Sequence, residues 1–120
     1  MITADFNGIP SGKPYICSQS LWQYDTGQQL QIKGLSGIDE TTEVHFGLKL
    51  YSRAIVKTGE YDSGANTLTV DIPNKFSEYA DGVPARVWVH LRKSETSAYT
   101  IREIQIPVSE REKPDDYISG

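Results

Sequence analysis

The sequence predicts an all-β protein, an antiparallel β-sandwich (Ig-like or jelly-roll-like) of about seven to eight strands with one short helical crossover. Three observations lead to this class. Apolar and polar residues alternate with a period of two along several segments. Turn-forming residues separate these segments at close spacing. The composition has ten Gly, six Pro and seven Tyr but one Met, which favours strands and turns over helices.

Residues 1–14 are expected to form an extended N-terminal arm with at most a short edge strand. Glycine and proline recur too often there for a regular element, at Gly8, Pro10, Gly12 and Pro14. Arms of this kind wrap a neighbouring subunit or lie across their own sheet.

Residues 15–108 are expected to form the sandwich domain. The clearest strand has Val44, Phe46, Leu48 and Leu50 on one face, with polar residues or glycine between them. Similar alternation occurs at Leu30 and Ile32, at Leu68, Val70 and Ile72, and at Val87, Val89 and Leu91. Such strands have one face in a core and the other in water, as in most antiparallel sheets.

The last strand of the domain changes phase. Tyr99 and Ile101 belong to one face, whereas Ile104, Ile106 and Val108 belong to the other. The switch at Arg102–Glu103 predicts a β-bulge, or a strand that crosses between sheets.

One short helical crossover is predicted between two of the strands. Pro73-Asn74 would start it, Phe76 and Tyr79–Ala80 would face inward, and Gly82 would end it.

Residues 109–120 are expected to form a charged C-terminal tail or linker. The segment 109–116 is dense in charge and has almost no apolar residues, which is typical of a solvated connector. In an assembly, this tail would dock through Tyr117 and Ile118.

Composition excludes several classes of function. The chain has 120 residues and a net charge of −4, so it lacks the basic surface that binds nucleic acid or an anionic membrane. No segment is long and apolar enough to span a membrane, and the N-terminus does not have the pattern of a signal peptide. The single cysteine, Cys17, indicates synthesis in a reducing cytosol and is expected to be a small buried apolar residue.

Catalytic and metal-binding motifs are not evident. His45 and His90 both fall on the polar phase of their strands, and if those strands were neighbours the two rings could share a metal. Two ligands are too few for a structural zinc site, so no metal and no cofactor are predicted. No nucleophile elbow, P-loop or dinucleotide fingerprint occurs, so no enzyme is predicted.

The aromatic residues are the main candidates for binding. Trp88 falls on the outward phase between Arg86 and His90, and Trp22 and Tyr24 precede a turn. Outward aromatics fill protein interfaces or stack on sugar rings. Trp88 could equally lie beneath the N-terminal arm or the short helix.

The order of several short motifs resembles a known family. Leu21–Leu30 resembles the "QYD-x-GQ-x-L" opening of small structural proteins in tailed phages and prophages of Gram-positive bacteria. Glu43–Phe46, Asp71–Pro73 and Arg86–Leu91 resemble that family's internal strands and turn. Tyr99–Tyr117 resembles its close, "IPV-x-x-R-x-KP-x-DY".

The resemblance implies the N-terminal β-sandwich of a phage minor structural protein, similar to the attachment domain of baseplate upper proteins. Such a chain would be a non-enzymatic virion component, made in the bacterial host cytoplasm. It would form homo-oligomers and bind other phage structural proteins. The alternatives are a head decoration protein, or a carbohydrate- or receptor-binding module that contacts a host glycan at the particle surface. The candidate interface residues are Trp22, Tyr24, Arg86, Trp88, His90, Pro114 and Tyr117.

Overall fold

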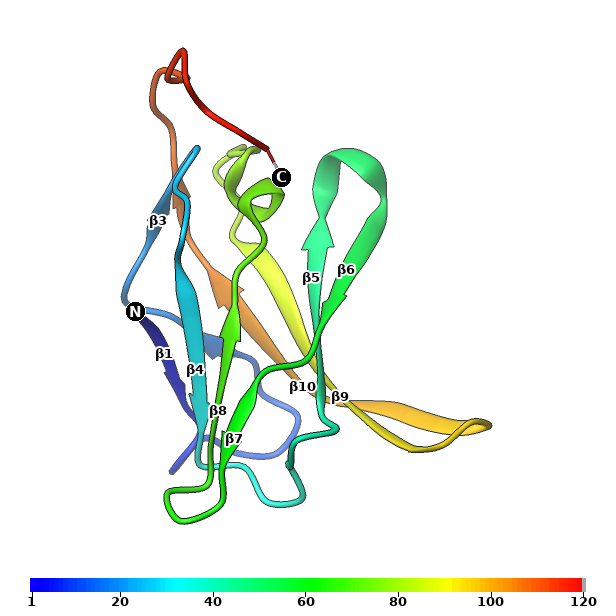
Figure 1. Cartoon of the computed structure of the whole chain (residues 1–120). Coiled ribbons are helices and arrows are strands. Elements are labelled where there is room, and N and C mark those ends of the chain that lie inside the picture. The colour runs from blue at the N-terminus through cyan, green and yellow to red at the C-terminus, as the bar shows by residue number, and fades with distance from the viewer. Residues whose placement is uncertain (120) are drawn as a thin grey trace.

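The computed structural model describes residues 1–119, which contain eleven strands in three sheets and two short 3₁₀ helices (Figure 1). A four-stranded sheet has the order β1-β4-β8-β7, a five-stranded sheet the order β2-β10-β9-β5-β6, and β3 pairs with β11. The strands are β1 (Ile2–Asp5), β2 (Tyr15–Ile16), β3 (Leu21–Trp22), β4 (Gln29–Lys33), β5 (Glu43–Leu48), β6 (Arg53–Lys57), β7 (Glu60–Asp62), β8 (Thr67–Asp71), β9 (Ala85–Ser94), β10 (Ser97–Ile106) and β11 (Val108–Ser109). The helices are η1 (Lys49–Tyr51) and η2 (Asn74–Ser77).

One hydrophobic core joins the two large sheets. The inward residues of β4 and β8 belong to the same buried cluster as those of β5, β9 and β10. Leu30, Ile32, Val44, Val87 and Ile104 are each fully buried in it. The all-β prediction is therefore confirmed, and each predicted alternation corresponds to a strand with one face in this core. Leu50 is the exception, because β5 ends at Leu48 and Leu50 lies in η1 with 63% of its surface exposed.

The sheets are mixed rather than purely antiparallel, which corrects the prediction. β1 pairs in parallel with β4, β2 with β10, and β3 with β11. Each of these pairs adds a short segment from the first 22 residues to a strand that comes later in the chain. β1 is the short edge strand that residues 1–14 were expected to allow, whereas β2 and β3 have two residues each, too few for a readable alternation.

The predicted N-terminal arm is part of the sandwich. β1 is an edge strand of the four-stranded sheet, and Ile2, Ala4 and Phe6 are buried in the core. The segment therefore lies on its own sheet, which is the second of the two expected alternatives. Cys17 follows β2 and is 3% exposed, which confirms that it is a small buried residue.

Two local predictions can be compared directly with the backbone. The β9–β10 register shifts between Thr100 and Arg102, so an irregularity of the predicted kind lies next to the expected position, Arg102–Glu103. The predicted crossover helix is the 3₁₀ helix η2, which buries Phe76 against Phe46 with ring centroids 5.3 Å apart. Tyr79 was expected to face inward but is 41% exposed, because η2 ends before it.

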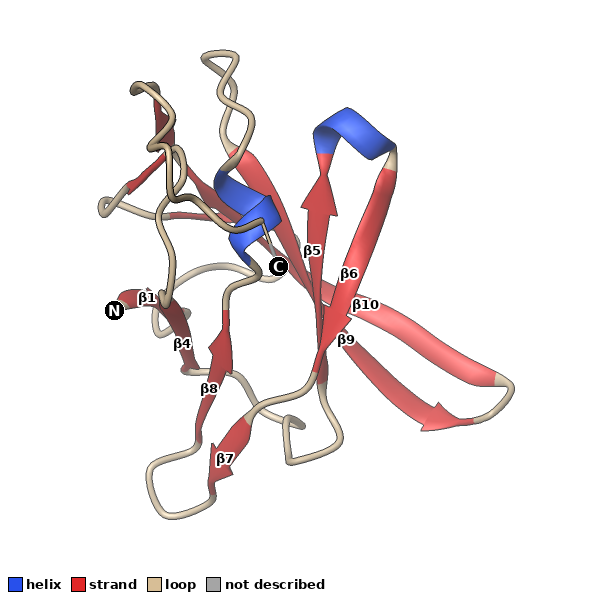
Figure 2. Cartoon of the chain, turned by 45° about the horizontal axis from the view of Figure 1, so that its top comes forward, coloured by secondary structure: helices blue, strands red, loops and turns tan. Residues whose placement is uncertain are grey.

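The β9–β10 hairpin extends beyond the packed sheets. Its inner part lies in the five-stranded sheet, and its outer part projects from the body of the molecule (Figure 2). We call residues 92–100 the hairpin tip, and all of them are exposed. Among residues 1–119, no helix is long and apolar enough to cross a membrane.

Candidate functional site

The outer face of the five-stranded sheet carries most of the chemically distinctive side chains. Along β9, Val87, Val89 and Leu91 are buried, so the residues between them point outward. Period-two alternation therefore places Arg86, Trp88 and His90 on this outer face, as the sequence predicts. We refer to this surface as the five-stranded face.

Trp88 is half-buried on this face, and Gly12, Lys13 and Pro14 of the N-terminal segment line a small hollow beside it. Its indole Nε1 donates a hydrogen bond to Glu103 Oε1 on β10, at 3.2 Å. The Arg86 guanidinium lies 5.4 Å from the centre of the Trp88 ring, within the range of a cation–π contact. On the other side, a Cβ built on Gly47 would lie 2.9 Å from Trp88 Cζ3. The absence of a side chain at Gly47 therefore lets the indole lie flat over β5.

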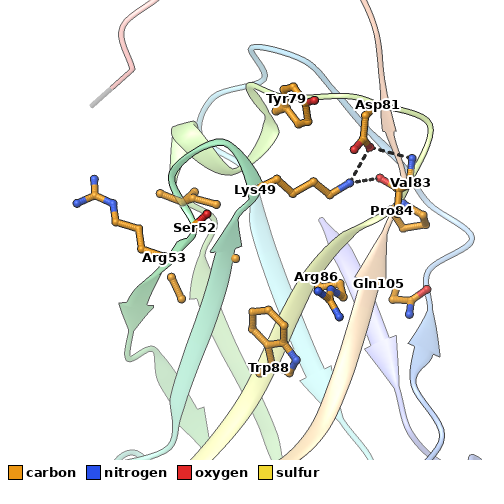
Figure 3. Close-up of a pocket in the computed structure, with 13 residues that line it drawn as sticks. Lys49, Ser52, Arg53, Tyr79, Asp81, Val83, Pro84, Arg86, Trp88 and Gln105 are labelled. Carbon is orange, nitrogen blue, oxygen red and sulfur yellow. Dashed lines mark hydrogen bonds and ion pairs between the residues drawn. The ribbon is translucent and has the colours of Figure 1, made fainter.

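A groove of about 800 Å³ opens beside Trp88, between the end of β5 and the loop that precedes β9 (Figure 3). Lys49 Nζ closes one side through an ion pair of 2.8 Å with Asp81 Oδ1 and a hydrogen bond to the carbonyl oxygen of Val83. The hydrogen bond from Lys49 lowers the pKa of Asp81, and the backbone N–H of Val83 adds to this effect. The groove thus has an ion-paired rim, and Trp88 and Arg86 belong to its lining.

Below the groove, the same face carries a cluster of Glu43, His45 and His90. The two imidazole rings are 4.5 Å apart, centre to centre, and His45 Nε2 lies 3.1 Å from Glu43 Oε1. Arg92 donates to both oxygens of Glu43, at 3.0 Å from Nε and 3.4 Å from Nη2. The sequence places each histidine on the polar phase of its strand, and the pairing of β5 with β9 brings the two rings together. The sequence analysis did not identify Glu43 as their partner.

The electrostatics of the cluster follow from these contacts. The hydrogen bonds from Arg92, and secondly from His45, lower the pKa of Glu43 to about 2. Burial, and then the positive charge of a protonated His45, lower the pKa of His90. Glu43 is thus a carboxylate at neutral pH, and His90 is a neutral imidazole there.

The remaining candidate residues lie elsewhere, around the C-terminal segment. Tyr117 packs edge-on against Tyr24, with ring centroids 5.1 Å apart, and its hydroxyl donates to Glu78 Oε2 at 2.6 Å. Burial, followed by this contact with Glu78, raises the pKa of Tyr117. Pro114 begins the turn that brings Tyr117 back, since its carbonyl oxygen accepts from the Tyr117 N–H at 3.2 Å.

The C-terminal segment therefore contacts its own domain around Tyr117, whereas its charged residues 110–113, 115 and 116 are exposed, as expected of a solvated segment. Arg111 N donates to Gln23 Oε1, and Asn74 Nδ2 donates to the carbonyl oxygen of Ile118. The Ile118 side chain is 74% exposed, so it stays available for the predicted docking in an assembly. Trp22 on β3 is 52% exposed, so of the predicted aromatics it is the most open to a partner.

Comparisons with known proteins add no assignment: no protein-family model matches the sequence, and no curated protein matches it either.

Proposed function

We propose that this chain is a non-enzymatic structural component of a bacteriophage virion, an attachment module of the tail or baseplate. It assembles through protein–protein contacts with copies of itself and with other virion proteins. The order of motifs between residues 21 and 118 supports this function. The single structural observation that carries it is the hairpin tip, residues 92–100, which extends from the sandwich and is exposed throughout (Figure 2).

The physical argument concerns the stability of the hairpin tip. A two-stranded ribbon with no third strand and no packed face is only marginally stable in water. Its outer backbone groups are also available for strand addition by another chain. Tyr99 is 47% exposed and gives the tip an aromatic anchor of the kind that interfaces favour. A binding partner would bury both the backbone edges and this ring.

Other exposed apolar side chains fit an assembling protein. Ile16 is 63% exposed and lies on β2, at one edge of the five-stranded sheet. Val56 is 50% exposed and lies on β6, at the opposite edge. Both edges of this sheet therefore present apolar surface beside free strand edges, which favours lateral contacts with other subunits.

The first experiment measures the mass of the full chain by size-exclusion chromatography with light scattering. We expect a homo-oligomer. In a shortened variant, Asn-Gly replaces residues 93–97 and joins Arg92 to Ala98, which face each other in the hairpin. The variant should keep its strand signal in circular dichroism but have a lower mass. A wild-type chain that is monomeric at every concentration would count against self-assembly through the tip.

The second experiment tests the virion directly. Phage particles purified from the host that carries this gene would be analysed by mass spectrometry and labelled with antibody against the chain. We expect a stoichiometric component with label at the tail or baseplate. Label on the head would select the head decoration alternative, and particles that lack the chain would contradict the proposal.

A glycan-binding module is the second candidate, favoured by Trp88 and Arg86 in the lining of the 800 Å³ groove. An aromatic face beside cationic and amide groups suits the stacking of a sugar ring. A glycan array probed with the wild type and with Trp88→Ala would decide this point. Binding that the substitution abolishes would favour this candidate, whereas an array with no signal would exclude it.

A further inference from the structure

The register of β5 and β9 brings three potential metal ligands together. Glu43 and His45 are two residues apart on β5 and therefore share its outer face. His90 stands directly opposite Glu43 in the antiparallel β5–β9 pair, and His45 lies on the diagonal. One ligand atom from each of the three side chains lies within 4.8 Å of the other two. All three side chains are half-buried, so they are partly ordered by their neighbours.

Two imidazoles and a carboxylate form a ligand set for a divalent cation of the zinc class. Zinc binds such atoms at about 2.0–2.2 Å, so tetrahedral ligands lie about 3.4 Å apart. His45 Nε2 and Glu43 Oε1 are already 3.1 Å apart. His90 needs only a small side-chain rotation to join them, because its ring is in contact with that of His45.

Neighbouring groups orient two of the three ligands. Thr100 Oγ1 on β10 lies 3.2 Å from His90 Nδ1, which leaves Nε2 as the nitrogen for coordination. The shorter hydrogen bond of Arg92 is to Glu43 Oε2, which leaves Oε1 toward His45. Hydrogen bonds of this kind to coordinating side chains are the usual outer shell of protein metal sites.

We propose that Glu43, His45 and His90 form a binding site for a zinc-class divalent cation on the five-stranded face. The side chains supply three ligands, and the fourth position faces outward to water or to a group of a binding partner. The Arg92 guanidinium balances the charge of the Glu43 carboxylate. Affinity therefore comes mainly from the two imidazoles, and nitrogen-preferring ions such as Zn²⁺, Ni²⁺ and Co²⁺ are favoured over Mg²⁺ or Ca²⁺. This inference does not depend on the proposed function.

The chain is well suited to a direct test, because His45 and His90 are its only histidines. Zn²⁺ alone would be titrated into the chelator-treated, untagged full chain while the ring protons of both histidines are followed by NMR. We expect both sets of signals to shift together and to saturate at one ion per chain. Mg²⁺ at the same concentrations should leave them unchanged.

Variants assign the ligands, with calorimetry as the measurement. His45→Gln and His90→Gln should each weaken Zn²⁺ binding by at least about tenfold, and Glu43→Gln should weaken it as well. Glu60→Gln is the matched control, because Glu60 is an exposed carboxylate on β7 of the other sheet, and binding should not change. Circular dichroism establishes that each variant is folded.

Either of two results would overturn the proposal. Histidine signals that stay in place up to millimolar Zn²⁺ would show that the cluster is only an ion-pair network around Arg92. Zn²⁺ binding that survives both histidine substitutions would place the ion elsewhere. If a histidine variant does not fold, the NMR titration of the wild type still tests whether His45 and His90 bind Zn²⁺.

Discussion

The two outer faces of the sandwich are built by the same alternation but carry different chemistry. On the four-stranded sheet, the outward positions of β4 and β8 hold glutamine and threonine, with one charged residue at the end of each strand, Lys33 and Asp71. They satisfy one another locally, as in the 3.0 Å hydrogen bond from Gln29 Nε2 to Asp71 Oδ1. The five-stranded face instead holds a tryptophan, two histidines and a network of arginine–carboxylate contacts.

This difference supports the proposal that the five-stranded face is the interaction surface. Threonine and glutamine on a sheet face favour the strand conformation and keep the surface wetted. The five-stranded face has a groove, exposed edges and a projecting hairpin, which are features of an interaction surface. The predictions below compare matched positions on the two faces.

The largest difference in unfolding free energy should come from substitutions at the central outward residues of the two sheets. Trp88→Ala removes the packing of the indole against Gly47 and Arg86, and it should cost about 2 kcal/mol of unfolding free energy. Thr69→Ala, at a central outward position of β8, should cost less than about 1 kcal/mol. Urea unfolding followed by circular dichroism measures both. Equal costs would mean that the two faces are energetically alike.

A smaller loss of unfolding free energy is expected from Gly47→Ala. The new methyl group would meet Trp88 Cζ3 at 2.9 Å and the carbonyl oxygen of Arg86 at 3.1 Å, so we expect a loss of about 1–2 kcal/mol. In the Trp88→Ala background the loss should shrink, which a double-mutant cycle detects.

The control for this substitution lies on the other sheet. Gly64→Ala in the turn between β7 and β8 meets only Asp62 Oδ1, at 3.4 Å, and should stay within about 0.5 kcal/mol of the wild type. A cost of Gly47→Ala that does not depend on Trp88 would contradict the described packing.

The smallest expected effect is a dependence of folding stability on pH that comes from Glu43. The pKa of Glu43 is lowered from its ordinary value of 4.5 to about 2 in the folded chain. A lowered carboxyl pKa gives stability that is present above pH 4.5 and is lost as the pH falls toward 2. Glu43→Gln should therefore flatten the fall of the urea midpoint between pH 4.5 and 2, measured in chelator-treated buffer. Glu60→Gln, on the other sheet, should leave that fall unchanged.

Much of the fold can be predicted from the sequence because alternation is a local signal. β4, β5, β8, β9 and β10 each have one face in the core, so their side chains alternate in a readable way. β6 could not be found in this way, because it is an edge strand whose residues are all exposed or half-buried. β2, β3 and β11 have two residues each, which is too short for any period.

The candidate site, too, could be predicted only as far as local alternation allows. Alternation places His45 and His90 on outer faces, but only the register of β5 against β9 determines that their rings meet. Glu43 could have been noted as a carboxylate two residues before His45 on the same face. Tyr117 shows the opposite case: charge density predicted a solvated tail, whereas long-range contacts with Tyr24 and Glu78 hold Tyr117 against the domain.

Carboxyl labelling of the chain, in purified particles and free in solution, tests most directly whether the five-stranded face and its hairpin form the assembly surface. Carbodiimide coupling modifies exposed Asp and Glu side chains, and mass spectrometry locates them. We predict that assembly protects Glu95 at the hairpin tip and Glu103 beside Trp88. Glu60 and Asp71 on the four-stranded sheet should react equally in both samples. Protection of Glu60 and Asp71, with Glu95 and Glu103 still reactive, would contradict the account.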